Sequence, residues 1–152
     1  MSTIEQSSQP GRILLVEDDP HDVELVQIAL ESQYLVNQID HVEDGEKALQ
    51  YLFGTNESST PHALPKLVLL DLKLPKVGGL QVLQAIRASP RTRQLVVVVM
   101  TSSQEDSDIN VCYDLGINSY IVKPLDFQQF VSVARHIGLY WMNLNKPPLF
   151  LT

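Results

Sequence analysis

The sequence has 152 residues, of which 44% are hydrophobic and 19% charged, a balance typical of one globular domain rather than of a disordered chain. Its net charge of −7 disfavours non-specific binding to nucleic acid or to an anionic membrane, so we expect neither as a partner. The polar residues 1–10 do not resemble a secretory signal, and no apolar run is long enough to span a membrane. A single cysteine, Cys112, excludes an internal disulfide and is typical of a cytoplasmic protein.

Five short apolar runs recur along the chain as candidate strands. They occupy residues 12–16, 34–39, 66–70, 95–100 and 119–122. The first, third and fourth runs are continuously apolar and rich in branched side chains, which is typical of strands buried on both faces.

The stretches that follow these runs have helical periodicity. They predict helices at residues 20–33, 43–53, 79–88, 104–115 and 125–137. Asp19 is the expected N-cap of the first helix, and a glycine follows the second, fourth and fifth helices, as is common where helices end. Strands that alternate with helices predict an α/β fold, a doubly wound parallel sheet with helices on both faces. Residues 54–65 are expected to form a surface loop.

Polar side chains follow four of the predicted strands. Glu17, Asp18 and Asp19 follow the first strand, Asp71 the third, Thr101 the fourth and Lys123 the fifth. The carboxyl ends of parallel strands lie at one edge of the sheet, where ligands of open α/β folds bind. We therefore expect these side chains to form one site.

The residue types predict the chemistry of this site. Carboxylates that share a small pocket repel one another unless a cation lies between them. Oxygen ligands without nearby cysteine or histidine favour Mg²⁺, which is commonly held by one or two carboxylates and a phosphate oxygen. Lys123 and Thr101 are suited to contact phosphate oxygens. Asp71 then reads as a nucleophile that forms an acyl phosphate.

The segments ILLVEDDP, LVLLDLKLP, VVVVMTSS and SYIVKPLD together resemble the receiver domain of two-component response regulators, over about residues 11–138. The resemblance implies a flavodoxin-like fold with a five-stranded sheet in the order 2-1-3-4-5, flanked by five helices. It also implies phosphorylation of Asp71 by a histidine kinase. Such a domain is not an enzyme but a phosphoacceptor, with Mg²⁺-dependent self-phosphorylation from a small donor and autodephosphorylation.

The same resemblance assigns the metal ligands. Asp18 and Asp71 are expected to bind Mg²⁺ directly, together with the backbone carbonyl of Lys73. Glu17 takes the other acidic position and acts through water. An alternative register would pair Asp18 with Asp19, but the spacing from the strand favours Glu17 with Asp18 and leaves Asp19 to cap the helix.

The switch positions of the family also have counterparts here. Thr101 is expected to move toward the phosphoryl group, and Tyr120 to follow it from outside to inside. Ser102 lies where receivers have a small residue beside the phosphate. Lys73 and Ser103 occupy positions that tune hydrolysis of the phosphorylated form.

A narrower resemblance is to the stand-alone response regulators paired with cyanobacterial phytochromes, which lack an output domain and tend to be homodimers. The segment GEKALQYLFG, the long polar loop and the residues after 138 carry it. Residues 139–152 are then a C-terminal arm that forms a dimer or partner interface, with Tyr140, Trp141, Leu149 and Phe150 as its contacts. The alternative is an arm that packs on its own domain.

The sequence thus favours a phosphorylation switch whose output is a changed protein–protein interaction surface, with a sensor histidine kinase of phytochrome type as its partner. A constitutive dimeric adaptor with a receiver fold is an alternative, although a scaffold has no use for clustered charges. A phosphatase with an aspartyl nucleophile is another, but Lys73 stands where such an enzyme usually has a second acid.

Overall fold

The structure, a computed structural model, describes residues 11–35, 38–55 and 63–148. Within these residues the strands are β1 (Ile13–Val16), β2 (Ile39–Val42), β3 (Leu67–Leu70), β4 (Val97–Thr101) and β5 (Ser119–Val122). They pair in parallel in the order β2-β1-β3-β4-β5, which confirms the predicted flavodoxin-like sheet. β1, β3 and β4 are buried along their whole length, as their apolar runs predict.

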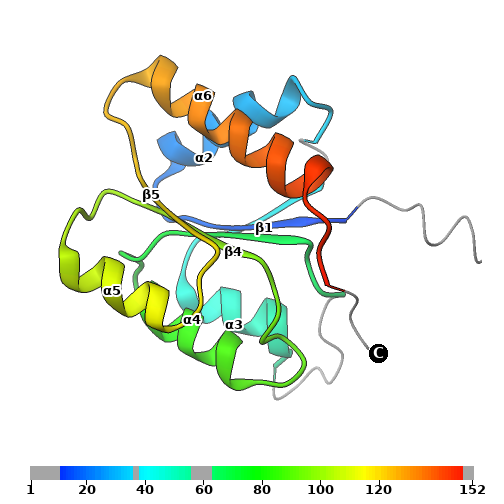
Figure 1. Ribbon diagram of the computed structural model, residues 1–152, viewed down its shortest axis with the longest axis vertical. Coiled ribbons are helices and arrows are strands. Elements are labelled where there is room, and N and C mark those ends of the chain that lie inside the picture. The colour runs from blue at the N-terminus through cyan, green and yellow to red at the C-terminus, as the bar shows by residue number, and fades with distance from the viewer. Residues whose placement is uncertain (1–10, 36–37, 56–62, 149–152) are drawn as a thin grey trace, which may run out of the picture.

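Helices cover both faces of the sheet. They are α2 (Pro20–Glu31), α3 (Gly45–Phe53), α4 (Gly79–Ala88), α5 (Asp106–Asp114), α6 (Phe127–Gly138) and the π-helix η2 (Leu139–Leu144). α2 and α6 lie on one face, and α3, α4 and α5 lie on the other (Figure 1). The side chains of β1 alternate between two hydrophobic clusters, with Ile13 in the first and Leu14 in the second.

The second strand does not lie where we predicted it. The expected range was 34–39, whereas β2 spans Ile39–Val42. Tyr34 has a φ of 61°, and the N–H of Leu35 donates to the Leu30 carbonyl 3.0 Å away, so this segment forms the turn after α2. An edge strand such as β2 needs fewer apolar side chains than a central strand. The apolar run at 34–39 was therefore a misleading guide to the position of this strand.

Three helices begin two residues later than predicted. The residue before each of α3, α5 and α6 is an acid in extended conformation, namely Asp44, Glu105 or Asp126. The Asp44 and Asp126 side chains accept hydrogen bonds from backbone N–H groups of the first turn. These acids are N-caps, so they lie outside the helices that we predicted to include them.

Helix α6 ends at Gly138, as we predicted, but the chain stays helical beyond it, in the π-helix η2. Gly138 has a helical φ of −60°. A Cβ at this position would overlap the side chains of Leu30 and Gln33. Gly138 therefore serves the close approach of α6 to the end of α2, and the chain runs on into η2.

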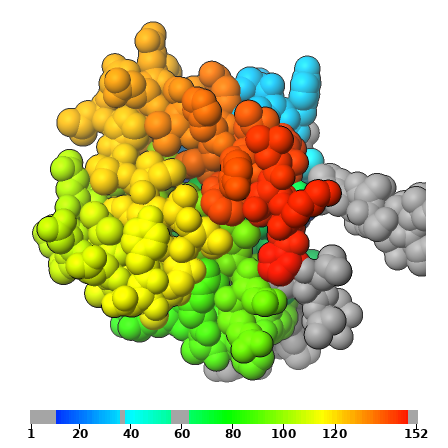
Figure 2. All heavy atoms as spheres, viewed as in Figure 1, coloured from blue at the N-terminus to red at the C-terminus, as the bar shows by residue number. Residues whose placement is uncertain are grey.

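Residues 139–148 lie against the domain itself. Met142 is buried, and the half-buried Trp141 packs on the same cluster as β1 and α6. Lys66 Nζ donates to the Met142 carbonyl at 2.7 Å. Figure 2 shows this red segment lying beside the orange helix α6 on the surface.

Some predictions fall outside the described residues: the polar tail at 1–10 and the contact residues Leu149 and Phe150. In the part of the chain that is described, no helix has the length and apolar character to cross a membrane.

Candidate functional site

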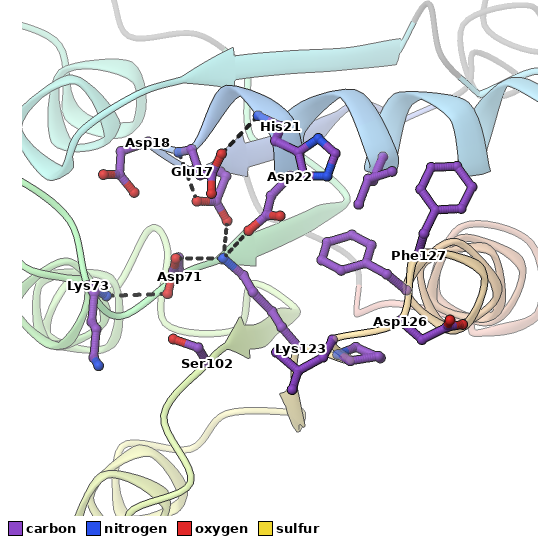
Figure 3. Close-up of a pocket in the computed structure, with 15 residues that line it drawn as sticks. Glu17, Asp18, His21, Asp22, Asp71, Lys73, Ser102, Lys123, Asp126 and Phe127 are labelled. Atoms are coloured by element: carbon purple, nitrogen blue, oxygen red, sulfur yellow. Dashed lines mark hydrogen bonds and ion pairs between the residues drawn. The ribbon is translucent and has the colours of Figure 1, made fainter.

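An acidic pocket of about 470 Å³ lies at the carboxyl edge of the sheet. Residues that follow β1, β3, β4 and β5 line it, together with residues of α2 and α6 (Figure 3). The chain leaves β1 toward β2 on one side, and β3 lies on the other, so the strand order reverses at β1. Ligands of open α/β sheets bind at such a reversal.

The ammonium group of Lys123 lies at the centre of this pocket. Its Nζ lies 2.8 Å from Glu17 Oε1, 2.8 Å from Asp22 Oδ2 and 2.9 Å from Asp71 Oδ2. Burial alone lowers the pKa of Lys123, but the hydrogen bonds to these carboxylates outweigh burial and leave the pKa above its ordinary value. The lysine is therefore charged at any physiological pH.

Asp71 follows β3 directly and is buried. Its N–H donates to the Val16 carbonyl at 3.1 Å, which extends the pairing of β1 and β3 to this residue. Its Oδ1 accepts a bond from the Lys73 N–H at 3.3 Å, and its Oδ2 accepts one from Lys123. The carboxylate is thus held from both sides at the edge of the sheet.

Gly79 supports the backbone at Asp71. The Gly79 N–H donates to the Leu72 carbonyl at 2.9 Å. A Cβ on Gly79 would overlap the Asp71 carbonyl oxygen and Leu72 Cα. The missing side chain lets α4 begin directly beside Asp71. The sequence predicted that a helix starts at this residue, without indicating its contact with Asp71.

Glu17 is also buried, at 4% exposure. Its Oε1 faces Lys123, and its Oε2 accepts a bond from the Asp19 N–H at 3.1 Å. Burial raises the pKa of Glu17 to about 7. The hydrogen bond to Lys123 opposes this rise without cancelling it, and the charge of Asp71 adds a smaller increase. An additional cation would favour the ionised form of Glu17.

The acids predicted as metal ligands lie together. Glu17, Asp18 and Asp71 each offer a carboxylate oxygen, and these oxygens lie within 4.8 Å of one another. A cluster of oxygen donors with one exposed member fits a hard cation such as Mg²⁺, which retains some of its water. The Lys73 side chain points away from Asp71 (Figure 3), so any role of Lys73 as a ligand falls to its backbone carbonyl, which stays a prediction.

The predicted switch residues share a set of hydrogen bonds. Thr101 ends β4 and is fully buried, and its Oγ1 accepts a long bond of 3.5 Å from the Ser103 N–H. The Tyr120 hydroxyl donates to the Ser103 carbonyl at 3.0 Å, and the Ser103 hydroxyl donates to Asp108 at 2.6 Å. Among the described residues, Ser102 lines the pocket, whereas Thr101 does not.

Asp22 is the site residue that the sequence did not reveal. It lies in the first turn of α2, three residues after the N-cap Asp19, where an acid is unremarkable. Its contact with Lys123 spans 101 residues of the chain. The sequence did offer one indication of this role. Asp22 lies about one helical turn after Asp18 and Asp19, on a helix that starts at the site.

Comparison with known proteins identifies the family. A model of the response regulator receiver domain matches residues 13–135. The chain belongs to the response regulator receiver family. The probable methanogenesis regulatory protein FilR2 of Methanothrix harundinacea is 38% identical to this receiver over 94% of this chain and 91% of its own.

Two further relatives are response regulators with solved structures. Rcp1 of Synechocystis sp. is 33% identical over 91% of this chain and 93% of its own. A crystal structure of its Mn²⁺-bound form has a TM-score of 0.85 and covers 92% of this chain and 100% of that one, at 32% identity. The phosphorylated cyanobacterial phytochrome response regulator RcpA has a TM-score of 0.86, at 34% identity, over 93% of this chain and 100% of its own. These matches confirm the predicted resemblance to receivers and to phytochrome response regulators.

Proposed function

We propose that this receiver is a phosphorylation switch in which Asp71 accepts a phosphoryl group from a histidine kinase. The observation that carries the proposal is one pocket that combines a buried carboxylate, a three-oxygen cation cluster and a lysine ammonium 2.9 Å from Asp71. These are the groups that phosphoryl transfer to a carboxylate requires: a nucleophile, alignment and neutralisation of charge.

Phosphoryl transfer to Asp71 exchanges one bond at phosphorus for another. An Asp71 carboxylate oxygen attacks the phosphorus of a phosphohistidine, a P–O bond forms, the P–N bond breaks, and the imidazole nitrogen leaves with the electron pair. With acetyl phosphate as the donor, acetate leaves instead. In autodephosphorylation, water attacks phosphorus, its proton passes to solvent, and the Asp71 carboxylate leaves with the electron pair.

Glu17, Asp18 and Asp71 fit the role of a Mg²⁺ site, with the Lys73 carbonyl as a further ligand, and the Mn²⁺-bound form of Rcp1 supports this assignment. Bound Mg²⁺ supplies positive charge to the phosphoryl oxygens. Lys123 donates an N–H to one of these oxygens.

Thr101 and Tyr120 convert the phosphorylation of Asp71 into a conformational change. Thr101 donates its hydroxyl to a phosphoryl oxygen after it turns from its buried position, and the small Ser102 leaves space beside the phosphate. The Tyr120 hydroxyl is bonded to the Ser103 carbonyl, two residues after Thr101, so movement of Thr101 reaches Tyr120 through this segment.

We assign a phytochrome-type histidine kinase as the donor, on the similarity to Rcp1 and RcpA. The rim of the pocket supports a protein donor. Leu125 is fully exposed there and Phe127 is 53% exposed, and both line the pocket mouth. Exposed apolar side chains beside a reactive group are suited to contact with another protein. We place this exchange in the cytoplasm, as the sequence predicts.

We further propose that phosphorylation changes a protein–protein surface and that the receiver forms a homodimer. The segment η2 exposes Tyr140 and Leu144, at 49% and 63%, beside the half-buried Trp141. Large exposed apolar side chains of this kind are typical of interfaces. Light scattering with and without acetyl phosphate measures the mass. A monomer in both states would contradict the dimer, and an unchanged dimer would favour the constitutive adaptor.

Incubation with acetyl phosphate and Mg²⁺ tests the phosphoacceptor. We expect one phosphoryl group per chain, released by hydroxylamine, which cleaves acyl phosphates but not phosphate esters of serine or threonine. Asp71→Asn should incorporate none. Asp114→Asn, at the exposed end of α5, is the matched control and should be labelled normally. Labelling of Asp71→Asn, or equal labelling in EDTA, would contradict the proposal.

A further inference from the structure

Three carboxylates surround the Lys123 ammonium. An ammonium group carries three N–H bonds, and Glu17, Asp22 and Asp71 each place an oxygen 2.8 to 2.9 Å from Nζ. A phosphoryl oxygen on Asp71 therefore competes for the Lys123 ammonium with Glu17 and Asp22, which already lie within hydrogen-bond distance of it.

The three partners differ in their relation to the reaction. Asp71 is itself converted to the acyl phosphate. Glu17 belongs to the three-oxygen cluster at the cation position. Asp22 belongs to neither group: it comes from α2 and meets the ammonium from the side away from Asp71 (Figure 3).

We propose that Asp22 is a positioning residue that competes with the phosphoryl group for the Lys123 ammonium and thereby weakens the phosphorylated state. The inference rests on the proposed role of Asp71 as the phosphoacceptor. The Asp22 contact, at 2.8 Å, is as short as the one to Glu17, and the Asp22 side chain is only 17% exposed. Solvent and salt therefore screen this pair little.

The position of Asp22 is also constrained, so its carboxylate cannot move freely with the Lys123 ammonium. It lies in the first turn of α2, which the Asp19 side chain caps through a 2.8 Å bond from the His21 N–H. Helix α2 is packed against α6. When the ammonium turns toward a phosphoryl oxygen, the bond to Asp22 lengthens or breaks, and the carboxylate loses a partner while partly buried.

The charge of Asp22 gives this competition a distinctive signature. A negative charge at this position favours a nearby divalent cation and disfavours a negatively charged phosphoryl group. A neutral residue at position 22 should therefore weaken binding of Mg²⁺ and strengthen binding of a phosphoryl analogue. A residue with a purely structural role would weaken both when replaced, or neither.

The test is titration calorimetry on the full chain, first with Mg²⁺ alone and then with beryllofluoride, an analogue of the phosphoryl group on a carboxylate, at saturating Mg²⁺. Asp22→Asn is compared with Asp19→Asn. Asp19 lines the same pocket, and asparagine caps a helix as well as aspartate does, so this control removes one charge while the cap remains. Within the described residues, the Asp19 carboxylate makes no ion pair with Lys123.

We expect Asp22→Asn to bind beryllofluoride about three- to tenfold more tightly and Mg²⁺ more weakly by a similar factor, because one nearby charge is removed. Asp19→Asn should change either affinity by less than about twofold, since its exposed charge is screened. Asp22→Glu, which keeps the charge, should resemble the wild type, and thermal unfolding of each variant verifies its fold.

Equal shifts in Asp22→Asn and Asp19→Asn would overturn the inference, because a general effect of charge would then suffice. Weaker beryllofluoride binding by Asp22→Asn would also overturn it, because Asp22 would then aim the ammonium at the phosphoryl group. A wild-type protein that binds no beryllofluoride at saturating Mg²⁺ would overturn the proposed function itself, and the inference with it. The titration of the wild-type protein alone reveals a failure of the proposed function, before any variant is compared.

Discussion

The Lys123 ammonium lies 2.9 Å from Oδ2 of Asp71, although 52 residues separate the two in the chain. The contact joins the residues that follow β5 to those that follow β3, with β4 between them in the sheet. The ammonium is also the partner of two further acids in the same pocket. We therefore expect the stability of the metal-free protein, and the proposed phosphorylation of Asp71, to depend on this one side chain.

Lys123→Met should destabilise the metal-free protein. Methionine keeps an apolar chain of similar length but leaves the buried acids Glu17 and Asp71 without their cation. We expect the free energy of unfolding in EDTA to fall by about 2–4 kcal/mol, measured by urea denaturation. The exposed Lys146 gives the control Lys146→Met, which should change it by less than about 0.5 kcal/mol. Equal midpoints for the two variants would argue against a central role of Lys123.

Gly79→Ala should disturb the position of Asp71. Its Cβ would overlap the Asp71 carbonyl, so we expect a loss of roughly 1–3 kcal/mol in stability and slower labelling by acetyl phosphate. Gly78 is the neighbouring control, because the nearest atoms to a Cβ there lie 4.0 Å away. Gly78→Ala should label at the wild-type rate. If both variants label alike, Gly79 does not position Asp71.

Glu17 should give the metal-free protein a characteristic pH dependence. Its pKa is raised from 4.5 to about 7 in the folded state, so between these values the folded protein binds more protons than the unfolded chain. The contribution of Glu17 to the free energy of unfolding therefore falls as pH rises through this window. Urea denaturation in EDTA at several pH values should show that Glu17→Gln gains stability relative to wild type as pH rises. A constant difference between the two proteins would refute the raised pKa.

Tyr120→Phe should loosen the segment between β4 and α5. The variant loses the 3.0 Å bond to the Ser103 carbonyl, and we expect a loss of about 0.5–1.5 kcal/mol. Amide hydrogen exchange near Ser103 should accelerate. Tyr113 is 52% exposed on α5, and Tyr113→Phe should leave the exchange unchanged. Unchanged exchange in Tyr120→Phe would remove Tyr120 from the proposed switch.

The central strands were predictable because strands buried on both faces require continuous apolar runs, as at Leu67–Leu70. The edge strand Ile39–Val42 was not, because one half-polar strand resembles a loop and the more apolar Leu35 packs in the turn after α2. The π-helix η2 after Gly138 was not predictable from the sequence, because packing against Leu30, rather than a turn, requires this glycine.

The clustering of Glu17, Asp18 and Asp71 followed from topology, since all carboxyl ends of parallel strands share one edge. Asp22 lies on a helix face, and its contact with Lys123 depends on the packing of α2 beside the end of β5. A pattern of local sequence does not encode that distance. The roles of Thr101, Tyr120 and the residues of η2 in a phosphorylated state stay predictions.

Borohydride reduction of the phosphorylated protein, followed by peptide mass spectrometry, tests the central claim most directly. Borohydride converts an aspartyl phosphate to homoserine, so the position of the acyl phosphate is read from the peptide. We predict homoserine at position 71 after treatment with acetyl phosphate and Mg²⁺, and none when the donor is omitted. Homoserine at position 18 or 22 instead, or at no position, would contradict the account.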